Sequence, residues 1–351
     1  MSVKKLLWKE SASLIVLANN RALRKPYNYD VLMLKRSERT SLRPNHVVFP
    51  GGIKESMDES PRWINYFKKI GIDDKLLRDL TVVNGQRPGI FRKTSPNSIE
   101  KEIALRITAI RETFEEVGLF LCRGKNNINN KKEFGEFTED FDRKHWQHEI
   151  HNDPSKFLNM CETLNVVPDL WSLYEWSVWL TPASDKKRFE TAFYLVAVDD
   201  KPNLICEEQE VNEVLWKNPK EYFQSYQSAD VWLQPPQIYE LSRLAGISEI
   251  EKVQKFASER NSKGLTLFLP VKHKCKNGLV GILPGDDYYP ENPNAFTEIR
   301  EVNENVDQYC SPVKRCHRII TGNNECRAIL NFQPFDGHLN PLDMKNIVSK
   351  L

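Results

Sequence analysis

Three glutamates on one predicted helix constrain this chain more than any other sequence feature. Between Asn97 and Gly118 apolar residues recur at steps of three and four, which predicts a helix with one buried stripe. Glu112, Glu115 and Glu116 stand at i, i+3 and i+4, so they share one face away from that stripe. Like charges at these spacings repel by roughly a few tenths of a kcal/mol per pair. Carboxylates converging from one helix suit Mg²⁺ or Mn²⁺, and the pattern predicts a site for such a cation.

The ends of this helix and its basic neighbour are also predicted. Asn97 with Glu100 three residues later has the pattern of a capping box, and Gly118 is a typical residue just past a helix C-terminus. Arg111 is the one basic residue on the turn of the glutamates, and we expect it to pair with a neighbouring glutamate. The plain alternative is a solvated acidic face, which scattered surface charges usually form.

A glycine-rich turn far upstream completes the pattern. Together with Phe49-Pro50-Gly51-Gly52, the glutamate segment resembles the box of the Nudix pyrophosphatases, G-x5-E-x7-R-E-U-x-E-E-x-G-U, where U is a bulky aliphatic residue. The run from Arg111 to Leu119 fits the second half of the box, apart from Thr113 at a U position. Gly52 fits the start, and Asp58 stands where the family has its first glutamate, with a shorter side chain.

The spacing within the box points to a subgroup. Between Asp58 and Arg111 lie 52 residues where the family pattern has seven, so the box carries 45 extra residues. Such a split box resembles that of the peroxisomal coenzyme A diphosphatases. Other segments of residues 10 to 245 also resemble that subgroup, namely Arg36-Ser37-Glu38-Arg39, Leu42-Arg43-Pro44, Pro168 to Trp171, Trp176 to Pro182, Arg188 to Phe193 and Trp232 to Gln237.

The resemblance implies a fold and a reaction. The expected fold is α/β, the Nudix α/β/α sandwich with a mixed central sheet. The expected reaction is metal-dependent hydrolysis of the pyrophosphate bond of coenzyme A or acyl-coenzyme A, giving 3′,5′-ADP and a 4′-phosphopantetheine compound. The implied metal ligands for Mg²⁺ or Mn²⁺ are Glu112, Glu115, Glu116 and the Gly52 carbonyl; Arg111 joins the glutamates as a catalytic residue, and Arg36, Arg39, Arg43, Gly51 and Gly52 bind substrate.

Local patterns suggest how the chain is organised. We expect a Nudix domain over residues 10–245, with the insertion at about 59–103, and a C-terminal extension over 246–351. Pro61 is a good helix entry within the insertion and Gly71 a natural stop, while residues 81–97 have the glycine and proline content of a surface loop. Strands are predicted at Ser13 to Ala18, Tyr29 to Leu34 and Phe193 to Val198. The insertion is either a lid or acyl-chain platform, or a decoration without a chemical role.

Two groups of side chains leave alternatives open. Many Nudix folds use a carboxylate from a late loop as metal ligand or base, and the candidates are Glu207, Glu208, Glu210 and Glu213. Trp171, Trp176 and Trp179 could stack on an adenine or line a pantetheine channel, but large aromatic residues are more often core.

Composition and the last residues bear on partners and compartment. The 50 basic and 48 acidic residues give a formal charge of +2, which excludes the profile of a nucleic-acid-binding protein. Seven cysteines without a C-x-x-C pair disfavour a disulfide framework, and no apolar run is long enough for a membrane span. Ser349-Lys350-Leu351 matches a peroxisomal address read by the import receptor, so we expect the peroxisomal matrix.

Two other functions remain possible from the sequence. The same chemistry could act on another nucleoside diphosphate derivative, such as NADH or ADP-ribose. A catalytically silent Nudix-fold binding module is the second, but it has no need for a repulsive acidic patch.

Overall fold

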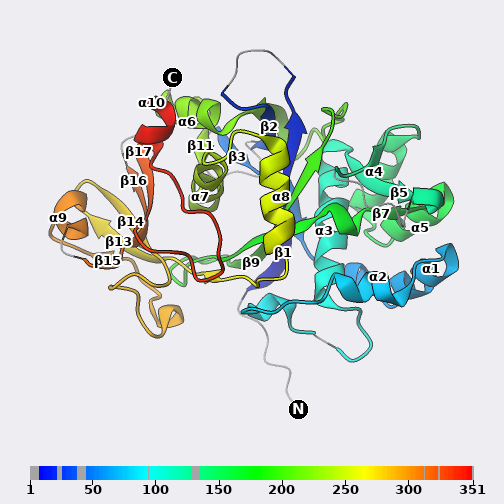
Figure 1. Cartoon of the computed structure of the whole chain (residues 1–351), viewed down its shortest axis with the longest axis horizontal. Coiled ribbons are helices and arrows are strands. Elements are labelled where there is room, and N and C mark those ends of the chain that lie inside the picture. The colour runs from blue at the N-terminus through cyan, green and yellow to red at the C-terminus, as the bar shows by residue number, and fades with distance from the viewer. Residues whose placement is uncertain are drawn as a thin grey trace.

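A nine-stranded mixed sheet forms the centre of the protein (Figure 1). The computed structural model describes residues 8–21, 26–37, 45–93, 95–127, 134–311, 313–322 and 325–349. The strand order is β11-β3-β2-β1-β9-β8-β12, with β10 paired to β2 and β4 paired to β1. The strands are β1 (Lys9–Asn19), β2 (Tyr29–Arg36), β3 (His46–Val48), β4 (Gly51–Ile53), β8 (Tyr174–Leu180), β9 (Phe189–Val198), β10 (Val211–Lys217), β11 (Trp232–Leu233) and β12 (Leu267–Phe268). The three predicted strands are therefore confirmed, each somewhat longer than predicted.

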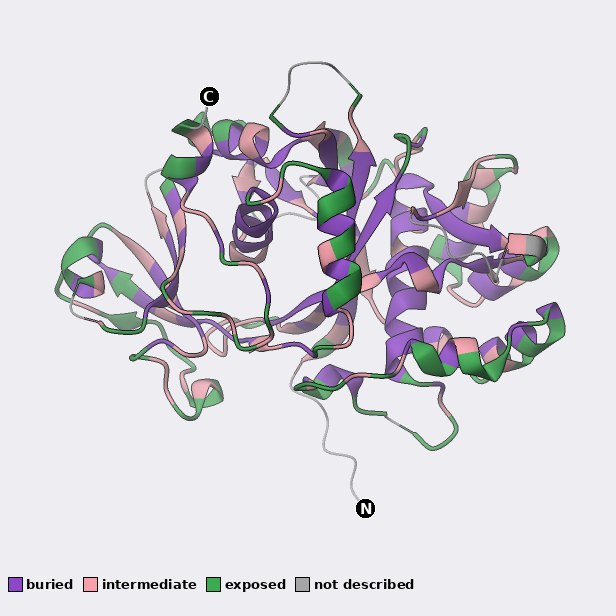
Figure 2. Cartoon of the chain, in the orientation of Figure 1, coloured by how far each residue is buried: buried purple, intermediate pink, exposed green. Residues whose placement is uncertain are grey.

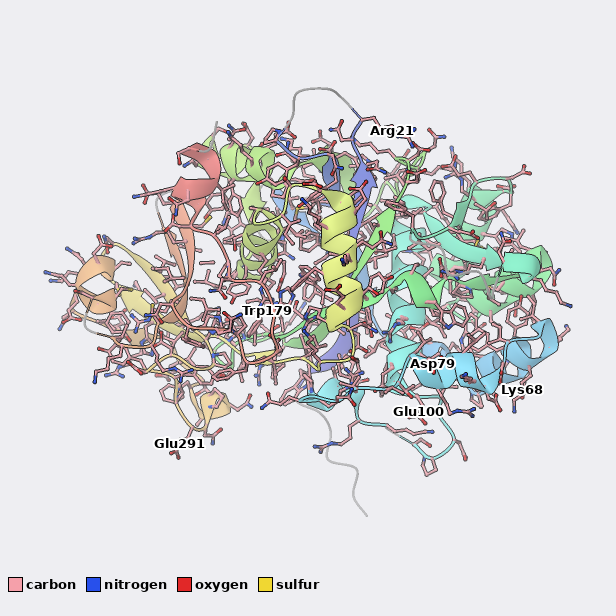
Figure 3. The ribbon with its side chains drawn as sticks, in the orientation of Figure 1. Arg21, Lys68, Asp79, Glu100, Trp179 and Glu291 are labelled. Atoms are coloured by element: carbon pink, nitrogen blue, oxygen red, sulfur yellow. The ribbon has the colours of Figure 1, made fainter. Side chains whose placement is uncertain are left out.

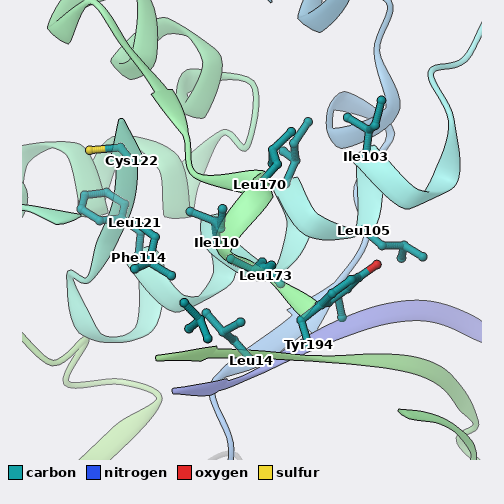
Figure 4. Close-up of a cluster of buried hydrophobic side chains, with 14 of the residues drawn as sticks. Leu14, Ile103, Leu105, Ile110, Phe114, Leu121, Cys122, Leu170, Leu173 and Tyr194 are labelled. Atoms are coloured by element: carbon teal, nitrogen blue, oxygen red, sulfur yellow. The ribbon is translucent and has the colours of Figure 1, made fainter. Parts of the chain in front are cut away.

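Both faces of this sheet are buried. Side chains alternate along β1, so Leu14 and Val16 join one core while Ile15 and Leu17 join the other. Figure 4 shows Leu14 of β1 and Tyr194 of β9 beneath Ile103 and Ile110 of α3. On this face lie α1 (Arg62–Ile70), α2 (Asp74–Asp79), α3 (Lys101–Val117), α4 (Arg143–Asn152) and α5 (Lys156–Leu164). On the other lie α6 (Pro219–Gln227), α7 (Pro235–Leu244) and α8 (Ile250–Arg260), which gives the expected three layers.

Helix α3 is buried on nearly all sides, as the purple colour in Figure 2 shows. It begins at Lys101, and the predicted capping box of Asn97 and Glu100 is wrong. Glu100 occupies the N-cap position without a side-chain cap, and its carboxylate binds Lys93 at 2.9 Å. The residues before it form a turn, with the Ile99 N–H donated to the Glu59 carbonyl at 3.1 Å. The C-terminal stop is confirmed: Gly118 has a φ of +67° and donates its N–H to the Phe114 carbonyl.

A small sheet and several short helices complete this side of the molecule. The small sheet consists of β5 (Phe120–Gly124), β6 (Phe137–Thr138) and β7 (Val166–Pro168). The short 3₁₀ helices here are η1 (Ser56–Glu59), η2 (Gly89–Phe91), η3 (Lys125–Asn127) and η4 (Leu170–Ser172). In the insertion α1 ends at Gly71 as predicted, and the described residues of 81–97 form the expected loop, largely exposed and interrupted by η2. Arg87 anchors this loop to the rest of the domain. Arg87 binds Glu102 of α3 at 2.9 Å and Glu175 of β8 at 2.8 Å.

The C-terminal part forms a second sheet. Its strand order is β15-β13-β14-β16-β17, seen at the left of Figure 1. Its elements are β13 (Val271–Cys275), β14 (Gly278–Ile282), η5 (Pro293–Ala295), β15 (Arg300–Glu301), α9 (Val306–Cys310), β16 (His317–Gly322), β17 (Glu325–Leu330) and α10 (Met344–Ser349). Ile319, Ala328 and Met344 share a core with Ile15 of the central sheet. The predicted domain boundary near residue 245 stays a prediction.

Two expectations from the sequence concerned disulfides and membrane-spanning segments. All seven cysteines are free thiols. Within the described ranges, we find no helix whose length and hydropathy would allow it to cross a bilayer.

Candidate active site

Strand β4 brings the two glycines against the glutamates of α3. Gly51 and Gly52 pair with Ser13 and Ala12 of β1, so these residues belong to a short strand and not to the turn that the glycines suggested. The Gly51 N–H donates to Glu116 Oε2 at 2.8 Å. A Cβ on Gly52 would lie 2.3 Å from Glu112 Oε2, so only glycine leaves room for that carboxylate. Residues far apart in sequence therefore meet as the split box predicts.

Arg111 lies at the centre of the acidic cluster and is 1% exposed. Its Nε and Nη2 donate to the two oxygens of Asp58, each at 2.9 Å. Its Nη1 lies 2.9 Å from Glu112 Oε1 and 2.5 Å from Glu115 Oε1. The expected pairing with a neighbouring glutamate is thus present, but the guanidinium also binds Asp58 and the Ile53 carbonyl.

Asp58 is the residue whose role the sequence left unclear. Its carboxylate is 2% exposed and accepts hydrogen bonds from Arg111, from Thr108 Oγ1 at 2.9 Å and from the Glu55 N–H at 2.9 Å. These contacts join η1 to α3 on both sides of the insertion. Asp58 is therefore a positioning residue that holds the guanidinium in place.

Burial sets the electrostatics of the three glutamates. Burial raises the pKa of Glu112 to about 8, against the opposing effect of Arg111 and with a further rise from Glu115. Burial also raises the pKa of Glu115, again opposed by Arg111. The pKa of Glu116 is raised well above its usual value, first by burial and then by Glu112, while the Gly51 N–H lowers it. These carboxyls favour protons or a cation over the free anionic form.

The positions of the three glutamates decide whether they can bind a metal ion. Among the residues that the structure describes, no three His, Cys, Asp or Glu side chains stand ready to hold a metal ion. One reason is that Glu115 points to Arg111, while Glu112 and Glu116 flank the two glycines. The charges of the three glutamates still act on one another, as an acidic patch implies, but Arg111 binds Glu112 and Glu115. The buried oxygen donors with raised pKa values still fit a hard divalent cation, which would replace their protons.

Arg36 is the predicted substrate-binding arginine that the structure describes. It ends β2, and its charge lowers the pKa of Glu116 against the larger effect of burial. Its buried Nε has no hydrogen-bond partner within the described ranges, so a donor is available beside the glutamates. The other two predicted arginines, Arg39 and Arg43, lie outside the described residues.

Comparison with known proteins identifies the family. The family model of the NUDT19 Nudix domain matches residues 8–244, and that of the NUDT19 C-terminal domain matches residues 273–331. The chain belongs to the NUDT19 family of Nudix hydrolases. A relative from Xenopus laevis, named acyl-coenzyme A diphosphatase NUDT19, is 35% identical, with 97% of each chain covered. A relative of the same name from Homo sapiens is 28% identical, covering 95% of this chain and 94% of its own.

A solved structure supports the Nudix fold. The crystal structure of a Nudix hydrolase from Alicyclobacillus acidocaldarius superposes with a TM-score of 0.52 at 20% sequence identity. It covers 71% of this chain and 96% of that one. The predicted fold class is therefore confirmed.

In this NUDT19-family chain, the late acidic loop also approaches α3. The Glu207 N–H donates to the Glu116 carbonyl at 2.9 Å, but the Glu207 carboxylate accepts from its own loop, including the Glu210 N–H at 3.0 Å. Glu213 lies 3.9 Å from Lys35. After burial and Glu112, the charge of Glu210 raises the pKa of Glu116 further. Glu210 is therefore the best candidate among the four for the additional metal ligand or base. The sequence alone did not allow this choice.

The tryptophans of β8 belong to the core. Trp176 and Trp179 are 0% and 3% exposed, and each donates its Nε1–H to Glu240 of α7 at 2.8 Å. Trp171 donates to the Leu76 carbonyl and is partly buried. The core interpretation is confirmed for Trp176 and Trp179.

Gly52→Ala should lower hydrolase turnover at least about 10-fold, because the new Cβ displaces the Glu112 carboxylate. Gly124→Ala is the matched control, since a Cβ there has no heavy atom of a described residue within 4 Å. Steady-state kinetics on both purified variants checks the expectation. Equal turnover in both would mean that Glu112 does not need its present position.

Proposed function

We propose that this chain hydrolyses the pyrophosphate bond of coenzyme A and acyl-coenzyme A, giving 3′,5′-ADP and 4′-phosphopantetheine or its acyl form. The observation that carries the proposal is the closed split box, in which Gly51 and Gly52 contact Glu116 and Glu112 across the insertion. Relatives similar along nearly the whole chain are named acyl-coenzyme A diphosphatase. The Arg36 Nε, which has no hydrogen-bond partner among the described residues, suits a phosphate oxygen beside this cluster.

The residues around the two glycines would hold Mg²⁺ or Mn²⁺. Glu112, Glu116 and the Gly52 carbonyl are the proposed ligands, and Glu115 can join them if it leaves Arg111. When bound, the ion supplies neutralisation of phosphate charge and a water of lowered pKa. Arg111 fixes the rotamers of Glu112 and Glu115, and Asp58 fixes Arg111. Arg36 orients the pyrophosphate against the glutamates.

Glu210 is the proposed proton acceptor or additional ligand. Glu210→Gln should lower kcat about 10²-fold or more, within the usual range for a lost general base. Glu208→Gln is the matched control, because Glu208 is exposed on the same loop. Measured kcat values with saturating Mg²⁺ separate the two variants. If Glu210→Gln keeps the activity of the control, the acceptor lies elsewhere.

The direct test of the function is product analysis. The purified chain is incubated with Mg²⁺ and, separately, coenzyme A, 3′-dephospho-coenzyme A, an acyl-coenzyme A, NADH and ADP-ribose, and the products are identified by mass. We expect 3′,5′-ADP from coenzyme A and its ester. If NADH or ADP-ribose is hydrolysed faster than coenzyme A and its ester, that compound is the preferred substrate and the proposal is wrong. If no compound is hydrolysed, the chain is a silent binding module.

We also propose peroxisomal import through the import receptor. Ser349 ends α10, and Lys350 and Leu351 lie outside the described residues. The tripeptide acts as an address when it forms a free C-terminus. Deletion of Leu351 should therefore leave a fluorescently tagged chain, tagged at its N-terminus, in the cytosol of cells that import the parent. Continued import of the deletion variant would require another signal.

A further inference from the structure

A cavity of about 480 Å³ lies between the insertion and the start of α3. In Figure 3 its edge is marked by Glu100, close to α2, which carries Asp79. The volume falls within the roughly 300–1,000 Å³ of ordinary small-molecule sites. Neither the metal site nor the phosphate contacts described above use it, although the insertion that forms it interrupts the catalytic box.

The floor of this cavity is apolar and its mouth is polar. The most buried lining residues are Leu77, Ile99 and Ile103, which are 5%, 4% and 2% exposed. The charged lining side chains are exposed, two of them acidic and two basic: Asp74, Glu100, Arg78 and Lys93. Since the formal charges at the mouth cancel and Lys93 already binds Glu100 at 2.9 Å, a phosphate or nucleotide gains little there. A hydrocarbon chain gains by covering the apolar floor.

The cavity is within reach of the catalytic carboxylates. Pro61 lines the cavity and follows Asp58 by three residues, so their Cα atoms are at most about 11 Å apart. Asp58 in turn binds Arg111 at 2.9 Å. Along α3, Ile103 and Glu112 are nine residues apart, a rise of about 14 Å.

The phosphopantetheine part of coenzyme A is about as long as the distance from the glutamates to the cavity. The chain from the phosphate oxygen of 4′-phosphopantetheine to its sulfur has about twelve atoms, the length of four extended residues, or about 14 Å. When the pyrophosphate lies beside Glu112 and Glu116, the thioester is therefore within reach of the insertion. The acyl group that follows the thioester can enter the cavity.

We propose that this cavity binds the acyl chain of an acyl-coenzyme A substrate. The inference rests on the proposed function and assigns the insertion within the box as the element that recognises the acyl group. Ile64 of α1 lines the cavity and is partly buried, so a larger side chain there shortens the space for the chain.

The test compares Ile64→Trp with Lys69→Trp. Lys69 lies on the same helix, is exposed and does not line the cavity. We measure kcat/KM for coenzyme A, acetyl-coenzyme A and lauroyl-coenzyme A below its micelle concentration. We expect Ile64→Trp to lower kcat/KM for the lauroyl ester about 10-fold or more and to change the value for coenzyme A less than about twofold. Lys69→Trp should match the parent on all three.

The outcomes separate this inference from the proposed function. If the parent cleaves none of the three compounds, the proposed function fails. If it cleaves them and Ile64→Trp leaves the lauroyl ester unaffected, only the cavity assignment is overturned. If Ile64→Trp loses activity on coenzyme A as well, Asn65→Trp at the exposed mouth decides by the same chain-length ratio. An unchanged ratio there overturns the assignment.

Discussion

Glu116→Gln is expected to lower turnover by about 10³-fold or more while the protein stays folded. The Glu116 side chain is 5% exposed and accepts the Gly51 N–H at 2.8 Å. A glutamine oxygen can accept the same hydrogen bond, but it brings no charge to a cation or to the developing phosphate charge. The measurement is kcat with saturating Mg²⁺, with circular dichroism to verify folding.

The same variant has an opposite expected effect on stability. Burial raises the pKa of Glu116 in the folded chain, so the folded state binds protons that the unfolded state has released. Metal-free parent protein therefore loses stability as pH rises above about 4.3, the ordinary carboxyl pKa, toward the raised folded value. Glutamine carries no such cost, so in EDTA at pH 8 Glu116→Gln should melt at or above the parent temperature. Added Mg²⁺ should stabilise the parent and not the variant.

Glu112→Gln should behave in the same way, since the pKa of Glu112 is raised by burial to about 8. The control is Glu208→Gln, an exposed glutamate of the late loop. Near-parent hydrolysis in either Glu112→Gln or Glu116→Gln would exclude the metal assignment. A Glu116→Gln protein that melts well below the parent in EDTA would contradict the buried, repelled carboxylate described above.

Local patterns predicted the parts of this protein that depend on neighbouring residues. The strand at Phe193 to Val198 was predicted from its apolar residues, and the helix that ends at Gly118 from the spacing of its apolar residues and from the glycine after it. Both are present. The capping box failed because residues 95–98 form a turn and the Ile99 N–H donates to the Glu59 carbonyl of η1 at 3.1 Å, so the helix begins only after it. The glycine segment became a strand because β1 offers it an edge to pair with. Neither competitor can be identified from a sequence window.

For the candidate site too, the sequence predicted the contacts within one helix but not those between distant segments. Helix spacing predicted that Glu112 and Glu116 lie on one side of α3. The match of Gly51 and Gly52 to the box predicted that these glycines lie against them. The same helix spacing predicted that Arg111 pairs with a neighbouring glutamate, which Glu115 provides. It could not show that Asp58 binds the same guanidinium, because that contact spans the insertion. Nor could it choose Glu210 among four acidic residues, since the choice depends on where the loop approaches Glu116.

Asp58→Ala is expected to destabilise the folded protein by about 3–5 kcal/mol, the usual cost of removing one partner of a buried ion pair. Arg111 is 1% exposed, and two of its nitrogens would lose their carboxylate partner. Denaturant unfolding at neutral pH measures the change. Asp79→Ala is the control, because Asp79 lies exposed on α2 (Figure 3) and should cost less than about 0.5 kcal/mol.

Asp58→Glu distinguishes a positioning role from a simple need for charge. It restores the residue that the Nudix box has at this position, but it adds a methylene to a carboxylate that already accepts four hydrogen bonds and is 2% exposed. Overpacking of this kind costs about 1–3 kcal/mol, so we expect stability between those of the parent and Asp58→Ala. Turnover should fall with it, because a displaced guanidinium releases Glu112 and Glu115. If Asp58→Glu matches the parent in both stability and kcat, the split box tolerates either acid and Asp58 serves only to neutralise Arg111.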